Sequence, residues 1–394
     1  MRSALLFLLL LFAQVSHAQE SGVQLARKNA INATKQSILE ECRRAANGDW
    51  SKWLASVKPY RDALKSICYS SWQNPNPSRS DPKLTYPLIS WVDDPAQLVH
   101  TNMALGMIDI GEDIEKYAAE NRLLPIAIGL TQWCRAQGID LILVPVPTKP
   151  EVYPEKLVAQ KELVPADLNV IPHLRRKLLE LLNHDVEVID LYPVFMRARK
   201  ESSELLYMTA DTHWRERPQR LAAAEIAARL NRYPWVAQAL KRPRLYQEVV
   251  RDFKEPDSFA DYISDEARAQ VAKYLAGAFH DVVAVPPGNA SVVSDSSPLL
   301  ITGDSYVDFA YPLSGCLVGH VARLINQPVS TSQTAGNLVA TFQDIFRDPD
   351  VLQHKKVIIW IMNDEPFGFD KMFPAEFKIP PPPVRQAKRA TPKL

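Results

Sequence analysis

The segment Leu299-Leu-Ile-Thr-Gly-Asp-Ser-Tyr306 constrains the fold of this chain more than any other. Its apolar first half predicts a strand that is buried on both faces, as in the interior of a parallel sheet. Gly303 permits a sharp turn after that strand, because glycine has no Cβ and adopts backbone conformations that other residues avoid. Such a turn would leave the hydroxyl of Ser305 and nearby backbone N–H groups free, which is typical of a catalytic nucleophile.

A serine is a weak nucleophile that needs a base, and the segment Asp211-Thr-His-Trp214 is the best source of one. In an extended segment, residues two apart project to the same side. The carboxylate of Asp211 can therefore accept a hydrogen bond from one imidazole nitrogen of His213 while the other nitrogen faces Ser305. Each motif alone is common, the first as a turn and the second as a capping pair. Together they predict a Ser-His-Asp catalytic triad.

Neighbouring residues have competing interpretations. His320 is the main rival base, but residues 317–324 predict a helix that leads away from the turn, so packing is the better interpretation. Asp304 is expected to cap the turn after the strand rather than to act in catalysis. Trp214 either lines the site or packs in the core, which is the commoner role of tryptophan. The other histidines show no spacing typical of a metal site, and we expect neither a metal nor another cofactor.

Helical patterns that lead into short apolar runs recur along the chain, and such runs have the length of strands. The helix-then-strand pairs are 124–137 with 139–146, 171–182 with 186–190, and 351–354 with 357–362, and a further strand covers 299–302. This repetition predicts a three-layer α/β domain with a mostly parallel sheet, whose ligands bind beyond the carboxyl ends of the strands. Residues 233–297 show a weaker pattern, helical only from Asp265 to Phe279, and are interpreted as an insertion.

The N-terminal residues predict export. Residues 1–18 combine one early arginine, an apolar run and a small-residue cleavage pattern, which is typical of a cleaved signal peptide. The apolar run is too short for a membrane-spanning helix, and no later segment is long enough. The mature protein is therefore expected in the periplasm or outside the cell.

A helical region is predicted for residues 19–85, with a break at Asn47-Gly48 between two helices. The two helices carry Cys42 and Cys68, and a disulfide between these cysteines is plausible in an oxidising compartment. Cys134 and Cys316 are expected to be buried side chains, because the sequence contains no Cys-x-x-Cys pair that would indicate zinc.

The main domain is predicted to span residues 86–375, followed by a proline-rich, basic tail at 376–394. That composition predicts an extended, disordered tail, and the alternative is a docking peptide for a membrane or a partner. Lys plus Arg number 46 and Asp plus Glu number 45. No overall charge would therefore direct the chain to nucleic acid.

Taken together, the motifs resemble the alginate O-acetyltransferase family (AlgJ and AlgX), whose domain is SGNH-hydrolase-like and flavodoxin-like. The resemblance covers about Leu124 to Phe369 and rests on four segments: Val144–Pro154, Ile189–Leu191, Asp211–Trp214 and Gly303–Tyr306. In that family the Asp-x-His motif precedes the serine, the reverse of the order in ordinary SGNH esterases. The same order here implies a circularly permuted arrangement of the motifs.

The resemblance also implies roles for two further residues. The family's tyrosine six residues after the nucleophile falls on Tyr311, a candidate to hydrogen-bond the substrate or the acetyl oxygen. Lys149 lies in the matching strand-end loop and is a candidate sugar contact, the alternative being a solvent-exposed loop lysine. The N-terminal helices and the basic run Arg215–Pro218 depart from the family pattern, which leaves the polymer open.

The function implied by the resemblance is a periplasmic O-acetyltransferase that carries acetyl on Ser305 and transfers it to hydroxyls of an exopolysaccharide. The implied partners are that polysaccharide, a membrane-bound O-acyltransferase that supplies acetyl where acyl-coenzyme A is absent, and an exopolysaccharide assembly complex. Two alternatives stay open. One is a carbohydrate acetylesterase with the same triad and water as acceptor, and the other is a non-catalytic scaffold of such a complex.

Overall fold

The structure is a computed structural model of the whole chain. It describes residues 2–78, 80, 83, 85–101, 103–104, 123–164, 169–256, 258–262, 265–285, 288–333, 339–363 and 377–382, and, from residue 21 onward, their side chains except at 86, 260, 266, 267, 270 and 333. The predicted end of the main domain at residue 375 and most of the predicted tail (383–394) lie outside the described residues. No helix within these ranges is apolar over a length that would cross a membrane.

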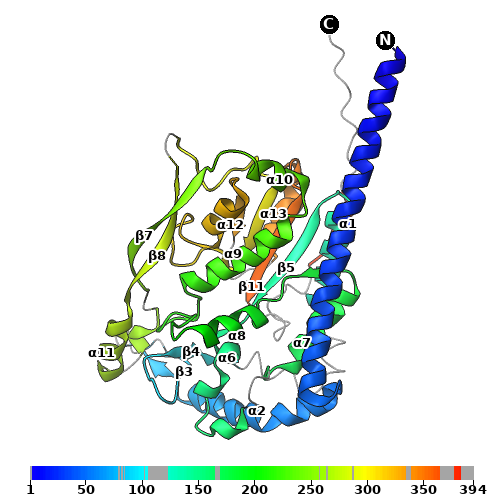
Figure 1. Cartoon of the computed structure of the whole chain (residues 1–394). Helices are drawn as coiled ribbons and strands as arrows, with labels where there is room; N and C mark the ends of the chain where they lie inside the picture. The colour runs from blue at the N-terminus through cyan, green and yellow to red at the C-terminus, as the bar shows by residue number, and fades with distance from the viewer. Residues whose placement is uncertain are drawn as a thin grey trace.

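A five-stranded sheet forms the centre of the molecule, with all strands parallel and in the order β10-β9-β11-β5-β6 (Figure 1). The strands are β5 (Asp140–Val146), β6 (Glu187–Val188), β9 (Leu299–Gly303), β10 (Ser330–Gln333) and β11 (Val357–Asn363). Every residue of β9 and β11 is buried, as in interior strands that have helices on both faces. The predicted parallel α/β domain is therefore confirmed.

Helices cover both faces of the sheet. They include α5 (Leu123–Arg135), α7 (Pro172–Asn183), α9 (Glu216–Leu230), α12 (Leu317–Ile325) and α13 (Ala340–Arg347). Trp133 of α5 contacts Phe346 of α13 with 4.9 Å between ring centroids, and Phe342 of α13 contacts Trp360 of β11 at 5.2 Å. Helix α9 packs against α12. The connection β5-α7-β6 moves toward one edge of the sheet, whereas β9-α12-β10 moves toward the other edge. Connections between parallel strands are right-handed, so the direction of the move decides which face the helix covers. Helices α7 and α12 therefore lie on opposite faces.

Short elements complete the edges of the domain. They are β1 (Asn76–Pro77), β2 (Thr85–Tyr86), β3 (Leu88–Ser90), β4 (Leu98–His100), α6 (Lys149–Val152), α8 (Tyr192–Glu201) and α10 (Pro234–Leu240). Helix α8 follows β6 at the carboxyl edge of the sheet, and β4 pairs with β3 antiparallel.

The N-terminal helices are α1 (Arg2–Ala46) and α2 (Trp50–Gln73), and the predicted break lies between them at Asn47 and Gly48, both with positive φ. Helix α1 packs along α7, whereas α2 turns away beneath the domain (Figure 1). The predicted disulfide is wrong, because Cys42 and Cys68 are buried thiols. Cys42 lies beside the turn, whereas helical rise puts Cys68 about 27 Å along α2, far beyond the reach of a disulfide of about 4–7 Å between Cα atoms.

The weakly patterned insertion is an antiparallel ribbon of β7 (Tyr246–Lys254) and β8 (Ala276–Ala284), joined through α11 (Asp265–Tyr274). The helix predicted from Asp265 to Phe279 is therefore too long, since its last residues belong to β8. Pairing with β7 overrides the helical pattern there. The ribbon extends from one side of the domain toward the carboxyl edge of the sheet (Figure 1).

Candidate active site

The serine turn is held tightly against the neighbouring strand. Strand β9 ends at Gly303, where a Cβ atom would lie only 1.9 Å from the carbonyl oxygen of Ile361 in β11. Only glycine fits this approach. The next residue, Asp304, accepts hydrogen bonds from the backbone N–H groups of Tyr306 at 2.9 Å and Asn363 at 3.0 Å, and its burial raises its carboxyl pKa. The expected capping role of Asp304 is thus observed, and it ties the turn to the end of β11.

The histidine lies on a loop that folds back on itself. Tyr207 and Trp214 form an antiparallel bridge, and the N–H of Met208 donates to the carbonyl of His213 at 2.9 Å. Within this loop the carboxylate of Asp211 accepts the backbone N–H of His213 at 2.8 Å. Asp211 and His213 are consequently fixed on the same side of the chain, as their spacing predicts.

The three predicted catalytic residues come together. The Nδ1 of His213 lies 2.6 Å from Oδ1 of Asp211, and its Nε2 lies 2.8 Å from Oγ of Ser305. A carboxylate only accepts, so Nδ1 carries the proton and Nε2 accepts from the serine hydroxyl. The side chain of Asp211 is 3% exposed and that of His213 is 14% exposed. The relay is buried at its carboxylate end and open at its histidine end, so solvent or a substrate can reach it.

The ionised state of Asp211 is favoured by its partners. Burial raises the pKa of this carboxyl, but the hydrogen bonds and charge of His213, together with a hydrogen bond from Ser258, more than offset that effect and hold the pKa below its ordinary value. A carboxylate behind the imidazole fixes its tautomer and stabilises the imidazolium that forms when Nε2 takes a proton. The arrangement therefore suits a general base acting on Ser305.

Two aromatic residues hold the imidazole in place. The ring of Phe309 stacks on that of His213, with 3.7 Å between centroids and 15° between planes. The hydroxyl of Tyr306 donates to the carbonyl of Thr212 at 2.9 Å, which joins the serine turn to the histidine loop. Ring orientation is thus set both by packing and by the carboxylate.

Lys149 lies in the core, which contradicts both the sugar contact and the exposed loop lysine that were expected. Its residue is 1% exposed, and its Nζ donates to the carbonyls of Leu98, Met208 and Thr209 at 2.8–3.0 Å. All three ammonium protons are therefore used inside the protein. Burial lowers the pKa of Lys149 to about 7. Instead of reaching a sugar, this side chain anchors the backbone that leads to Asp211.

The two remaining predicted substrate contacts are also packed inside the protein. Trp214 is 1% exposed and contacts the rings of Phe195 and Tyr306. It therefore packs in the core and does not line the site. Tyr311 stacks on Phe253 of β7 at 4.3 Å, and burial raises its pKa. Tyr311 is 7% exposed, so its ring is buried against the β7–β8 ribbon.

The inserted ribbon contributes residues that the sequence did not single out. Glu255, just after β7, forms an ion pair with Arg215 and accepts the N–H of Thr209 at 3.3 Å. The N–H of Phe259 donates to the carbonyl of Ala210 at 3.0 Å, and Ser258 bonds Asp211. These residues lie far along the chain from the histidine loop and no local pattern marks them. Phe309 could have been suspected only from its position, because it is an aromatic residue four places after the nucleophile.

His320 is confirmed as a packing residue. It is fully buried in α12, where its Nε2 lies 3.1 Å from Oε1 of Glu216 and its Nδ1 lies 3.5 Å from Oε1 of Glu248. Cys134 and Cys316 are buried, as expected. Within the described part of the chain, no group of three or more His, Cys, Asp or Glu side chains could hold a metal ion.

Comparisons with known proteins agree with this architecture. Residues 113–364 match the family model described as "SGNH hydrolase-like domain, acetyltransferase AlgX". The O-acetyltransferase domain of Pseudomonas putida AlgJ is similar in structure, with a TM-score of 0.51 and 17% identity, over 71% of this chain and 91% of that one. For Pseudomonas aeruginosa AlgX the TM-score is 0.47 with 18% identity, over 71% of this chain and 62% of that one. No curated protein matches the chain.

The family match extends over well more than half of the chain and includes Asp211, His213 and Ser305, whereas α1 and α2 lie outside it. The AlgJ structure supports the same fold. Both the resemblance and the predicted class of enzyme, an O-acetyltransferase, are confirmed. This chain belongs to the acetyltransferase AlgX family of SGNH hydrolase-like domains.

Proposed function

We propose that this protein moves acetyl groups through an acetyl-serine intermediate onto hydroxyls of an exopolysaccharide in the periplasm. The observation that carries the proposal is the relay from Asp211 through His213 to Ser305, with contacts of 2.6 and 2.8 Å. Such contacts match the geometry required for a base-activated serine nucleophile. The acetyltransferase family and the predicted signal peptide at residues 1–18 support the reaction class and the location.

The first half-reaction acylates the serine. His213 Nε2 removes the proton from Ser305 Oγ as the oxygen attacks the carbonyl carbon of an acetyl donor. The negative charge on the carbonyl oxygen is stabilised by the backbone N–H of Ser305, whose neighbour Tyr306 already donates its own N–H to Asp304. The bond to the leaving group breaks, the imidazolium returns its proton to that group, and acetyl-serine remains.

The second half-reaction reverses these roles. A sugar hydroxyl gives its proton to His213 and attacks the acetyl carbon, after which Ser305 leaves with a proton from the imidazolium. We propose that a membrane-bound O-acyltransferase supplies the donor, because acyl-coenzyme A is absent from the periplasm. The protein would act within an exopolysaccharide assembly complex.

Product analysis tests the proposal. The purified chain is incubated with an acetyl-ester donor and a set of oligosaccharides, and the products are weighed by mass spectrometry. Acetylated oligosaccharide is expected, together with a mass increase of one acetyl group on Ser305 in quenched samples. Release of acetate without transfer would instead identify an acetylesterase, because water would then be the acceptor.

The matched variant is Ser305→Ala, which should lower both transfer and acetate release by about 10⁵-fold or more, since removal of a nucleophilic serine eliminates the covalent route. Unchanged biological function in this variant, with no acetate released by the wild-type protein from any ester, would point to the scaffold role instead.

A further inference from the structure

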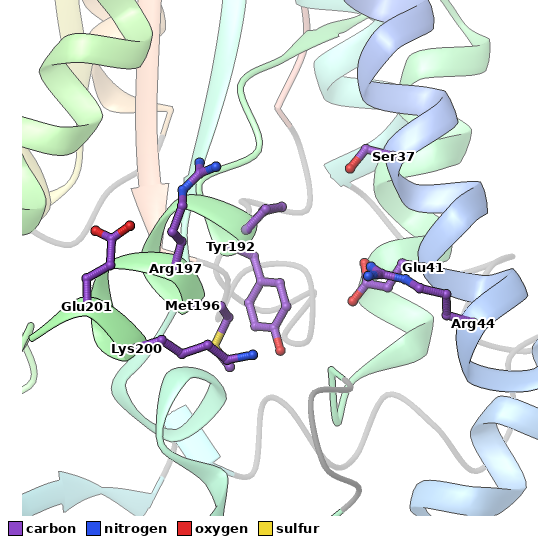
Figure 2. A pocket seen from close by; sticks show the side chains of 9 residues that line it. Ser37, Glu41, Arg44, Tyr192, Met196, Arg197, Lys200 and Glu201 are labelled. Atoms are coloured by element: carbon purple, nitrogen blue, oxygen red, sulfur yellow. The ribbon is translucent and has the colours of Figure 1, made fainter.

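A pocket lies between α1 and α8 (Figure 2), and none of the three triad residues lines it. Its volume is about 460 Å³, within the range of small-molecule sites. Helix α1 contributes one wall and α8 the other, and both bring charged side chains. The lining residues are Ser37, Glu41, Arg44, Tyr192, Pro193, Met196, Arg197, Lys200 and Glu201. Because α1 lies outside the family match, one wall of this pocket, with three of its nine lining residues, belongs to the first N-terminal helix.

A buried ionic network fixes the two walls relative to each other. Arg175 of α7 is 1% exposed and bonds Glu41 of α1 at 2.8 Å. The same guanidinium bonds both carboxylate oxygens of Asp190, just before α8, at 2.9 and 2.5 Å. At the other end of α7, Arg27 of α1 bonds Asp140 at 3.1 Å. Preorganised walls reduce the ordering cost of binding, so a ligand would find the pocket already formed.

The charges that remain accessible in the pocket are mainly positive. Glu41 is buried and already engaged by Arg175, while Arg44, Arg197 and Lys200 are exposed, with Glu201 as the exposed carboxylate. Within the described residues, neither Arg44 nor Arg197 forms an ion pair. Arginine binds carboxylates and other oxyanions through paired N–H donors. Pro193 and Met196 add apolar side chains to the same lining. A ligand with both an apolar face and anionic groups matches this lining.

The pocket lies on the same edge of the sheet as the nucleophile. Tyr192 begins α8 just after β6, and Ser305 follows β9, so both leave carboxyl ends of parallel strands. Strands β9 and β6 are separated by three strand spacings, or about 14 Å. An extended polymer of several sugar units can reach both places at once, whereas a single sugar cannot.

We propose that the α1–α8 pocket is an accessory site that holds an anionic segment of the acceptor polysaccharide while another unit of the same chain lies at Ser305. This inference rests on the proposed function. It assigns the N-terminal helices a role in acceptor binding, with Arg44 and Arg197 as the main contacts to negatively charged groups.

Binding and kinetics together test the accessory site. Binding is measured by calorimetry on the Ser305→Ala protein, which does not turn over, with carboxylate-bearing oligosaccharides and neutral ones of the same length. The double variant Arg44→Ala with Arg197→Ala should weaken binding of the carboxylate-bearing ligand about 10-fold, since each exposed ion pair is worth up to about 1 kcal/mol. Neutral ligands should be unaffected, and added salt should reduce the difference.

In the active protein the same double variant should raise the acceptor KM about 10-fold for long anionic acceptors. Its rate of acetate release from a small ester should stay that of the wild type. The matched control is Arg43→Ala, the adjacent residue of α1, which lies outside the pocket and pairs with Glu40. Equal affinities for wild type and double variant, with intact transfer, would overturn the accessory site alone. Absence of any acetate release or transfer by the wild type would overturn the proposed function instead.

Discussion

The catalytic triad and the α1–α8 pocket are built in opposite ways. The triad sits among buried, hydrogen-bonded groups, and its loop is held by Lys149, whose three protons all donate to backbone carbonyls. The pocket exposes its arginines to solvent, and the lining residue Glu41 is held by a buried ion pair with Arg175. The first arrangement fixes the reacting atoms, and the second presents Arg44 and Arg197 at the surface, where a ligand can reach them. Substitutions at the two places should therefore affect different kinetic constants.

The largest effect that separates the two regions is expected from Asp211→Asn. An amide cannot hold the imidazole in the same tautomer, so kcat should fall about 10³- to 10⁴-fold. Calorimetric binding of the acceptor oligosaccharide should not change, because Asp211 is not among the residues that line the pocket. Asp344→Asn, at an exposed carboxylate of α13, is the control and should keep full activity. A loss of acceptor binding in Asp211→Asn would show that the two regions are not independent.

A smaller but still large effect is expected from Lys149→Met. This change leaves three buried carbonyl groups without donors, which should cost about 3 kcal/mol of unfolding free energy in urea denaturation. The kcat should fall as well, since Met208 and Thr209 lead directly into the histidine loop. The matched control is Lys156→Met, because Lys156 also lies over the Trp91 ring but is partly exposed. A change equal to that of the control would mean that Lys149 does not anchor the loop.

On the pocket side, Glu41→Gln should have a more modest effect. Loss of the bond to Arg175 should lower the unfolding free energy by about 1–2 kcal/mol, because Arg175 keeps both of its bonds to Asp190. The acceptor KM should rise while acetate release from a small ester stays constant. Glu40→Gln, at an exposed ion pair on the same helix, serves as the control. A fall in ester hydrolysis would indicate that α1 supports the triad itself.

The final prediction concerns the pH dependence of stability. Burial lowers the pKa of Lys149 to about 7 from an ordinary value of 10.5. Between these two values the unfolded chain binds one more proton than the folded chain, so this group makes stability rise with pH, by up to about 1.4 kcal/mol per pH unit. The unfolding free energies of wild type and Lys149→Met are measured by denaturation from pH 7 to 10. The difference, wild type minus variant, should increase with pH. An identical slope in both proteins would refute the lowered pKa of Lys149.

The sequence predicted those parts of the fold that depend on local pattern. Uninterrupted apolar runs, such as 139–146 and 357–362, marked the interior strands, because a strand with helices on both faces has no polar side. Strand β10 was missed, since Ser-Thr-Ser-Gln at the edge of the sheet carries no such pattern. The β7–β8 ribbon was missed because its strands are stabilised by each other and half exposed, so part of β8 was interpreted as helix.

The residues proposed as the triad could be predicted because they lie in two short sequence motifs. Asp211 and His213 share a face of an extended segment, and Gly303 allows the turn that carries the serine. The structure does bring their side chains together. The candidate substrate contacts could not be predicted in the same way. A lysine in a strand-end loop is usually exposed, and only the three-dimensional convergence of β4 and the histidine loop buries Lys149. Similarly, the ribbon that covers Tyr311 is a long-range feature.

The four buried thiols allow local unfolding of this chain to be measured by chemical labelling. Burial raises the pKa of Cys134 and Cys316 to about 12, so almost no thiolate is present at neutral pH. Alkylating reagents react with thiolate, and each cysteine can therefore be labelled only when the surrounding structure opens. Labelling of Cys42 and Cys68 would report local unfolding of the N-terminal helices, and labelling of Cys134 and Cys316 would report local unfolding of the α/β domain. Labelling rates would rank the local stabilities of the two parts without any added probe.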